Sequence, residues 1–285
     1  MTLLDLRMLK SNMVDNLDST SNEDFLSANM GRELNSIKLD KLLRSYELIV
    51  DSINGNDSTA DGTELKSFKT ISAAYNYLPD FVKTVTIKIK DGTYIEESSI
   101  QLYKNIVNLT IESFSESNPN VIISCNSSDN RDSLIYISNS HKINLKNLKF
   151  TRSGNKVSGS CINIDCVNFD IDSCVFENAY CGIISSCCNG QINNCSFDSI
   201  VRGITANKAS NILSTNNNSL ANVEYGIVCN GSIVFNYGNN LKGTVEDYVT
   251  TLYGRVFNTS REVAVATIYN DTDGIIERGN TSVQE

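Results

Sequence analysis

Two acidic residues occupy the same place in a recurring pattern. Glu177 and Asp198 each directly follow a phenylalanine, and these phenylalanines, Phe176 and Phe197, are 21 residues apart. If that interval is one coil of a stacked sheet, the two carboxylates lie about one strand spacing apart, roughly 4.8 Å. Retaining glycosidases hold their two carboxyl groups at a similar separation. Glu177 and Asp198, with Arg202 nearby, are therefore the catalytic candidates, as acid and nucleophile or base. The alternative is a pair of solvated carboxylates at a corner, whose mutual repulsion is reduced by neighbouring arginines.

Two tyrosines are candidates for contact with sugar rings. Tyr180 and Tyr225 each lie near a glycine that opens an isoleucine-containing segment. An aromatic ring with a polar tip suits a surface that is partly apolar and partly wet. Both tyrosines either stack on a sugar or pack a corner of the fold.

The sequence predicts no metal and no cofactor. The nine cysteines include no Cys-x-x-Cys, and His141 is the single histidine, so the spacings of a zinc site are missing. Eight of the nine cysteines lie in the segment from Cys161 to Cys229. We expect the cysteines to be reduced, small apolar residues packed in a core.

Composition excludes several classes of partner. The 285 residues carry 24 basic and 33 acidic side chains, a net charge of −9. That balance disfavours nucleic acid, which needs a clustered basic surface, and it leaves no polybasic anchor for lipid. The apolar runs are too short for a bilayer span. Asp5 and Arg7 interrupt the first apolar residues, so we expect synthesis in the cytoplasm without a signal peptide.

The elements that must position the candidate residues come from a repeat of about two dozen residues. One column of apolar residues has steps of 26, 21, 23 and 21, and a second has steps of 21, 21 and 23. Cys174 with Cys195, and Cys166 with Cys187, recur in phase with them. The first column is Phe150, Phe176, Phe197, Leu220 and Leu241, and the second is Ile162, Ile183, Ile204 and Ile227.

This period predicts a mainly β protein built as a parallel β-helix, in which like residues stack from coil to coil. About seven coils fit between Val85 and Leu241 at roughly 22 residues each. Polar residues suited to tight turns are expected at one corner. These are Asn147, Ser173, Asn194 and Asn217.

Three regions follow from the pattern. Residues 54–241 form the β-helix, with a capping helix at about 68–78 and a strand at 85–89. Residues 242–285 are expected to form a β-rich cap or trimerisation tail. Residues 1–53 are predicted to be a helical attachment and stalk segment.

The stalk prediction depends on a narrow apolar stripe at heptad spacing. The stripe fits a helix folded back on its own domain and a short oligomeric coiled coil equally well. Outward-facing apolar residues on the isoleucine strands also need cover, which a trimer or the 242–285 tail would supply. The predicted trimer interface is Leu39, Leu42, Tyr46, Ile49, Ile53, Ile184 and Val228.

Two stretches resemble known families. Residues 68–79, FKTISAAYNYLP, and 85–94, VTIKIKDGTY, look like the opening of pectate-lyase-like right-handed β-helix proteins. Residues 14–34, VDNLDSTSNEDFLSANMGREL, resemble a segment near the start of phage tail-fibre and tail-spike proteins. Together they imply a right-handed β-helix in a trimeric phage or phage-tail-like particle protein that contacts the host surface. The paired Asp-Asp and the Gly-His-Gly motif of the polygalacturonase branch are missing.

Two functions follow as hypotheses. The first is a receptor-binding tail fibre or tail spike that binds host cell-surface polysaccharide, located in the virion and docked on other tail or baseplate proteins through its N-terminus. The alternative is a polysaccharide depolymerase, a glycosidase or lyase, on the same scaffold. A bacterial adhesin is disfavoured because no secretion signal is recognised.

Overall fold

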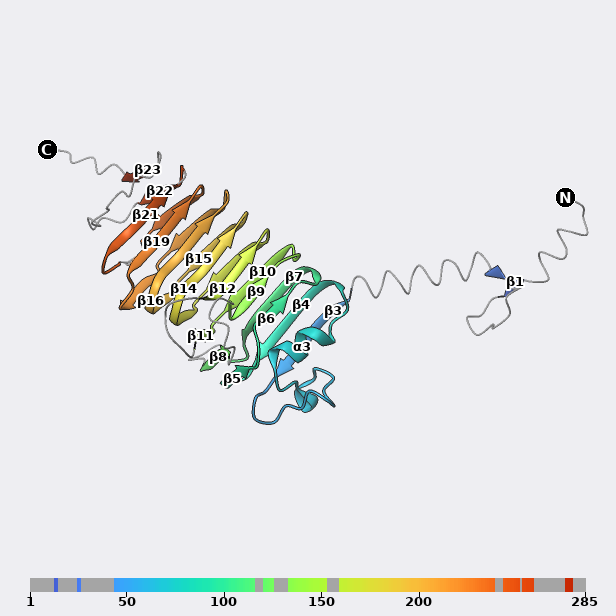
Figure 1. Cartoon of the computed structure of the whole chain (residues 1–285). Helices are drawn as coiled ribbons and strands as arrows, with labels where there is room; N and C mark the ends of the chain where they lie inside the picture. Colours follow the sequence, from blue (N-terminus) through green and yellow to red (C-terminus); the bar gives the residue numbers. More distant parts are fainter. Residues whose placement is uncertain are drawn as a thin grey trace, which may run out of the picture. The chain divides into compact units, whose positions relative to one another are not determined.

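The computed structural model describes residues 13–14, 25–26, 44–115, 120–125, 133–152, 159–238, 243–251, 253–258 and 275–278. The chain divides into two units, Met1–Ser45 and Tyr46–Glu285. In the first unit, β1 (Met13–Val14) pairs in parallel with β2 (Phe25–Leu26). The second unit contains the repeated sequence, and its strands stack side by side along one axis (Figure 1).

Sheet I is a ten-stranded parallel sheet with the spatial order β23-β22-β20-β17-β15-β13-β10-β7-β4-β3. Its strands are β3 (Ser45–Val50), β4 (Phe81–Ile89), β7 (Asn105–Ser113), β10 (Lys142–Lys146), β13 (Asn168–Asp172), β15 (Asn189–Asn193), β17 (Asn211–Thr215), β20 (Ile233–Tyr237), β22 (Arg255–Asn258) and β23 (Ile275–Arg278).

Sheet II has eleven strands, joined in the order β21-β19-β16-β14-β11-β8-β5 with β6, β9, β12 and β18 paired alongside. Its strands are β5 (Gly92–Glu96), β6 (Ile100–Leu102), β8 (Val121–Cys125), β9 (Ile135–Ile137), β11 (Lys149–Thr151), β12 (Ser160–Asp165), β14 (Val175–Ser186), β16 (Ser196–Asn207), β18 (Asn218–Ala221), β19 (Tyr225–Asn230) and β21 (Glu246–Thr251).

The chain passes from one sheet to the other in each coil and winds into a parallel β-solenoid of about seven turns. This confirms the predicted parallel β-helix. None of the helices in the described part of the chain is long and apolar enough to cross a membrane.

The core consists of residues stacked in register from coil to coil. The predicted isoleucine column is confirmed, because Ile162, Ile183, Ile204 and Ile227 pair in order and each is fully buried. The phenylalanine column is confirmed at Phe150, Phe176 and Phe197, whose ring centroids are 5.3 and 5.2 Å apart. A coil cannot bury its own inner face, so these stacks supply the burial that holds successive coils together.

The predicted phenylalanine column fails at Leu220. Ser219, not Leu220, pairs with Phe197, and a register shift then places Ala221 opposite Asp198. The preceding corner differs as well. Asn216 takes the corner position, while the predicted Asn217 is fully buried. The buried Asn217 amide accepts from the Cys195 N–H and donates to the Ile192 carbonyl, each at 2.8 Å, so it fills an interior position next to Cys195.

Corner residues with positive φ turn the chain between strands. Left-handed backbone is costly for most side chains, and Asn and Gly adopt it most readily. One corner repeats at Asn147, Ser173, Asn194 and Asn216, with φ between 53° and 56°. The N–H of each of these four residues donates to a carbonyl of the following coil. The expected polar corner is therefore confirmed, apart from the exchange of Asn217 for Asn216.

The capping helix is confirmed as α3 (Ile71–Tyr77), preceded by the 3-10 turn η1 (Glu64–Lys66). The Thr70 side chain accepts from the Ala73 N–H at 3.1 Å and so caps the helix N-terminus. The buried carboxylate of Glu96 accepts from the Ile71 N–H at 2.9 Å and from the Ser72 hydroxyl at 2.6 Å. These bonds tie the helix to strand β5 of the first coil. The predicted strand at 85–89 lies within β4.

The helical prediction is wrong for residues 45–50, which form β3 at the end of sheet I. Leu48, Ile49 and Val50 are buried within the chain, and Tyr46 packs against its core. The apolar run reads as a heptad stripe, but it is buried on both faces as a strand. Ile49 therefore offers no surface to another subunit, whereas Ile53 is 79% exposed. Leu39 and Leu42 lie outside the described residues.

Beyond residue 241 the solenoid continues. β21 pairs with β19, β22 with β20, and β23 with β22, so the two sheets extend into the region expected to be a separate cap or tail. Residues 242, 252, 259–274 and 279–285 lie outside the described residues.

Replacing Phe176 with Ala tests the stacked core. We expect the free energy of unfolding to fall by about 3–5 kcal/mol, because the middle ring of three is removed and a cavity remains. Urea unfolding followed by circular dichroism measures the change. Phe81→Ala is the matched control, since Phe81 is 46% exposed and its loss should cost about 0.5 kcal/mol or less. Equal losses in the two variants would contradict the stacking argument.

Candidate functional site

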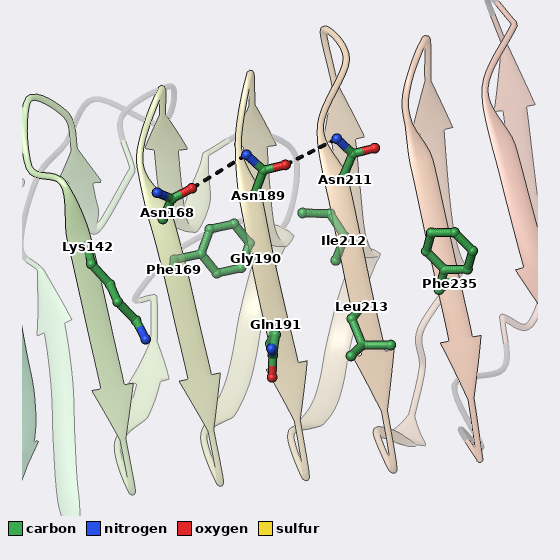
Figure 2. A pocket seen from close by; sticks show the side chains of 10 residues that line it. All are labelled: Lys142, Asn168, Phe169, Asn189, Gly190, Gln191, Asn211, Ile212, Leu213 and Phe235. Atoms are coloured by element: carbon green, nitrogen blue, oxygen red, sulfur yellow. Dashed lines mark hydrogen bonds between the residues drawn. The ribbon is translucent and has the colours of Figure 1, made fainter.

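A shallow groove of about 410 Å³ lies on sheet I and crosses strands β10, β13, β15, β17 and β20 (Figure 2). Two rows of side chains border it, and the inward-facing residues between the rows form its floor. One row is Lys142, Asn168, Asn189 and Asn211, the other is Gln191, Leu213 and Phe235, and the floor is Phe169, Gly190 and Ile212.

The first row contains a ladder of exposed side-chain amides. The Asn189 Nδ2 donates to the Asn168 Oδ1 at 3.5 Å, and the Asn211 Nδ2 donates to the Asn189 Oδ1 at 3.1 Å. All three amides point the same way, because Figure 2 shows the Asn168 nitrogen facing the coil of Lys142 and the Asn211 oxygen facing the coil of Phe235. Each amide has two N–H donors and two lone pairs, so the ladder uses only part of its capacity. The remainder is available to a polar ligand.

The second row ends in an aromatic platform. Phe235 stacks on Phe257 of β22, with ring centroids 4.9 Å apart and planes 13° from parallel. Phe235 is 38% exposed, and Tyr237, two residues further along β20 on the same face, is 41% exposed. A flat apolar surface therefore lies beside the amide ladder. Sites of this composition, apolar with a few placed polar groups, are typical of small-molecule and sugar recognition.

The floor of the groove depends on Gly190. A Cβ on this residue would lie 2.2 Å from the Phe169 ring, which is buried and covers the glycine from the preceding coil. The equivalent buried position in neighbouring coils is held by Ile143, Ile212 and Val234. The large Phe169 ring thus fills the space left by Gly190, where two aliphatic side chains would otherwise pack.

The predicted carboxylates lie on a different sheet, and the structure places them on adjacent coils as predicted. Glu177 of β14 pairs in register with Asp198 of β16. Glu177 also forms an ion pair with the Lys149 Nζ at 2.8 Å, and Asp198 accepts from the Ser199 hydroxyl at 3.2 Å. The pair is therefore two half-buried carboxylates with one cation attached, an arrangement that suits proton transfer or charge stabilisation as well as a solvated corner.

Arg202 and the two tyrosines form a neighbouring group. The Arg202 guanidinium lies 5.1 Å from the centre of the Tyr180 ring, and Arg202 pairs in register with Tyr225 on the next coil. Among the described residues Arg202 makes no ion pair with Glu177 or Asp198. The guanidinium thus stacks on an aromatic ring, and the two tyrosines lie beside it.

The two interface residues predicted on the isoleucine strands differ in burial. Val228 is only 5% exposed in the single chain, so the cover that we expected from a tail or a neighbouring subunit is already present. Ile184 remains half-buried, and its role in a trimer stays a prediction.

The groove is the feature that sequence reasoning missed. Asn168, Asn189 and Asn211 recur at steps of 21 and 22, in phase with the apolar columns. That spacing was a detectable signal. The spacing alone does not show which recurring polar side chains border a groove.

Comparison with known proteins supports the fold. A rhamnogalacturonan lyase structure matches 75% of this chain and 68% of its own at 12% identity, with a TM-score of 0.54. A GH136 lacto-N-biosidase from Eubacterium ramulus matches 88% of this chain and 69% of its own at 10% identity, with a TM-score of 0.42. No family model and no curated protein matches the chain. The likeness to the lyase is a likeness of β-helix architecture.

Replacing Gly190 with Ala tests how the floor is packed. The new methyl group must displace the Phe169 ring, so we expect a loss of about 1–3 kcal/mol in the free energy of unfolding. Urea unfolding measures it. The double variant Gly190→Ala with Phe169→Leu relieves the clash and should lose less than the sum of its single variants. Additive losses would show that the ring and the glycine are not coupled.

Proposed function

We propose that this chain binds a polysaccharide on the outer face of its β-helix, and that the sheet I groove is the binding site. The observation that carries the proposal is the exposed amide ladder beside the Phe235–Phe257 stack. Amides exchange hydrogen bonds with sugar hydroxyls in both directions, while aromatic faces pack against the apolar faces of sugar rings.

The dimensions of the groove favour a chain over a single small molecule. It crosses five strands, and parallel strands lie about 4.8 Å apart, so its length is roughly 19 Å. The groove is open along its side, as a long ligand requires.

The charge of the groove favours a neutral sugar. Lys142 is the one charged side chain among its lining residues, and the rest are amides, aliphatics and aromatics. The net charge of −9 on the whole chain disfavours a nucleic acid, whose phosphates need a basic surface. The name of the rhamnogalacturonan lyase supports a carbohydrate as the ligand class on this architecture.

Host attachment is a further part of this proposal. The resemblance of residues 14–34 to tail-fibre proteins supports it, but most of that segment lies outside the described residues. The two similar structures are a rhamnogalacturonan lyase and a lacto-N-biosidase, and neither is a phage protein. The trimer, the docking of the N-terminus on other tail proteins and the virion location therefore stay predictions that rest on the resemblance.

Alanine variants along the groove test binding. We expect Phe235→Ala to weaken binding about tenfold or more, because it removes the exposed face of the aromatic platform. The probe is an array of neutral and uronate oligosaccharides that includes rhamnogalacturonan fragments, followed by calorimetry on the tightest binder. Asn189→Ala, which interrupts the ladder at its middle, should weaken binding as well.

Phe81→Ala is the matched control for these variants, since it removes an exposed phenylalanine of sheet I outside the groove. Equal affinity of Phe235→Ala and Phe81→Ala would show that sugar binds elsewhere. Absence of binding across the whole array would refute the proposed function.

A depolymerase is the second candidate function. It is favoured by the registry of Glu177 with Asp198, which places the two residues on neighbouring strands roughly 4.8 Å apart. A retaining glycosidase needs about 5–5.5 Å between its carboxyl groups. Lys149 forms an ion pair with Glu177, and Arg202 lies on the same strand as Asp198, so both add positive charge that would suit the carboxylate of a uronate sugar.

Glu177→Gln and Asp198→Asn test this candidate. If the chain cleaves the polysaccharide that it binds, each substitution should abolish product while leaving affinity in the groove unchanged, because the two sites lie on different sheets. New reducing ends report hydrolysis, and absorbance of unsaturated uronate reports elimination. Asp170→Asn, a half-buried carboxylate on sheet I, is the control. Wild-type protein that binds the polysaccharide and releases no product would exclude the depolymerase.

A further inference from the structure

Two cysteines lie at the surface on adjacent coils, where the sequence predicted core residues. Cys166 follows β12, and Cys187 follows β14 one coil later. The Cys166 N–H donates to the Ser186 carbonyl at 2.9 Å, and the Cys187 N–H donates to the Asn207 carbonyl at 3.3 Å. The same backbone bond thus fixes both corners, and the two thiols occupy equivalent positions one above the other.

Their exposure separates these thiols from the other cysteines. Of the eight cysteines whose side chains the structure describes, six are buried and only Cys166 and Cys187 are exposed. Burial raises the pKa of the Cys161 thiol to about 12 and that of the Cys181 thiol to about 11, so these buried thiols stay protonated. The buried cysteines fit the predicted role as small apolar residues, and the exposed pair does not.

Both cysteines have a left-handed backbone conformation. Both residues have φ of 56°. This left-handed conformation is costly for most residues, and Asn, Asp and Gly adopt it most readily. Most other described residues with positive φ are Asn, Ser or Gly, for example Ser173, Asn194 and Gly238, although Lys208 and Ala209 adopt it in the next coil. Local backbone preference therefore does not account for cysteine at either position.

A carboxylate completes the group. Asp165 lies next to Cys166, with its Oδ1 3.6 Å from the Cys166 Sγ, and the ligand atoms of Asp165, Cys166 and Cys187 all lie within 4.8 Å of one another. In a tetrahedral zinc site, bonds of about 2.3 Å to sulfur and about 2.0 Å to oxygen separate the two ligand atoms by about 3.5 Å. The observed sulfur–oxygen distance already matches that value.

We propose that Asp165, Cys166 and Cys187 bind a thiophilic divalent cation of the Zn²⁺ type at this corner. Thiolates select zinc over Mg²⁺ and Ca²⁺, which prefer oxygen ligands. Three protein ligands at an exposed corner leave a fourth tetrahedral position for water or a partner's side chain. The next coil has Lys208 and Ala209 at this corner, so the cluster ends with two thiols.

Charge explains how the cation would hold the group together. Partial desolvation and the neighbouring Asp165 carboxylate raise the pKa of the Cys166 thiol. A divalent cation reverses that effect, because it neutralises the carboxylate and binds the thiolates. Binding replaces the two thiol protons with metal–sulfur bonds and releases both protons to solvent. This site is independent of the proposed polysaccharide binding.

The full chain, kept reduced and metal-free, tests the site by titration with Co²⁺. We expect one equivalent to bind and to produce the near-ultraviolet charge-transfer absorption of thiolate–cobalt bonds, and Zn²⁺ should then displace it. Cys166→Ser and Cys187→Ser should each reduce this absorption, and the double variant should lose it. Asp165→Asn should keep the absorption and lower the affinity.

Two controls keep these outcomes interpretable. Serine already occupies left-handed corners at Ser173 and Ser199, so the serine variants should fold, which circular dichroism checks. Asp170→Asn should bind Co²⁺ as the wild type does. Mass measurement confirms that no disulfide has formed between the two cysteines. Equal cobalt absorption in the double variant, or none in the reduced wild type, would overturn the proposal.

Discussion

The vertical registry of the coils is the constraint on which every other feature of this protein depends. Parallel backbone hydrogen bonding fixes each residue above its counterpart in the preceding coil, so residues one coil apart in the sequence become neighbours in space. Inside, this produces the stacked rings of Phe150, Phe176 and Phe197. Outside, the same rule aligns the asparagines of the groove and the thiols of the corner. Core and surface chemistry thus arise from one geometric repeat.

Residues that stack inward could be predicted from the sequence because burial restricts them to few types. The isoleucine column is visible as a period, and its registry follows directly. The adjacency of Glu177 and Asp198 was predictable for the same reason, since both follow a stacked phenylalanine. Where a coil has an extra residue, as at Leu220, the period of the sequence does not show at which position the strand pairing shifts. There the bulge shifts the pairing after Phe197.

Other features required the three-dimensional structure. The apolar residues of β3 fit a helical stripe as well as a strand buried on both faces, and only their packing against the first coil decides between the two. The groove was missed because outward-facing polar residues vary freely, so an asparagine ladder looks like ordinary surface composition. Cys166 and Cys187 lie 21 residues apart, far from any local zinc spacing, and only the coil length makes them neighbours.

The way β3 is joined to the loop that follows it bears on how molecules of this protein behave at high concentration. The Ile49 N–H donates to the Gly62 carbonyl, its own carbonyl accepts from the Phe68 N–H, and the Asp51 N–H donates to the Phe68 carbonyl. The outer side of the terminal strand is thus already bonded over this stretch. The unpaired N–H and C=O groups of an edge strand can pair with a strand of another chain. Here the loop that follows β3 pairs with these groups instead. Pairing with a strand of another molecule is therefore hindered at Ile49 and Asp51, where the solenoid begins.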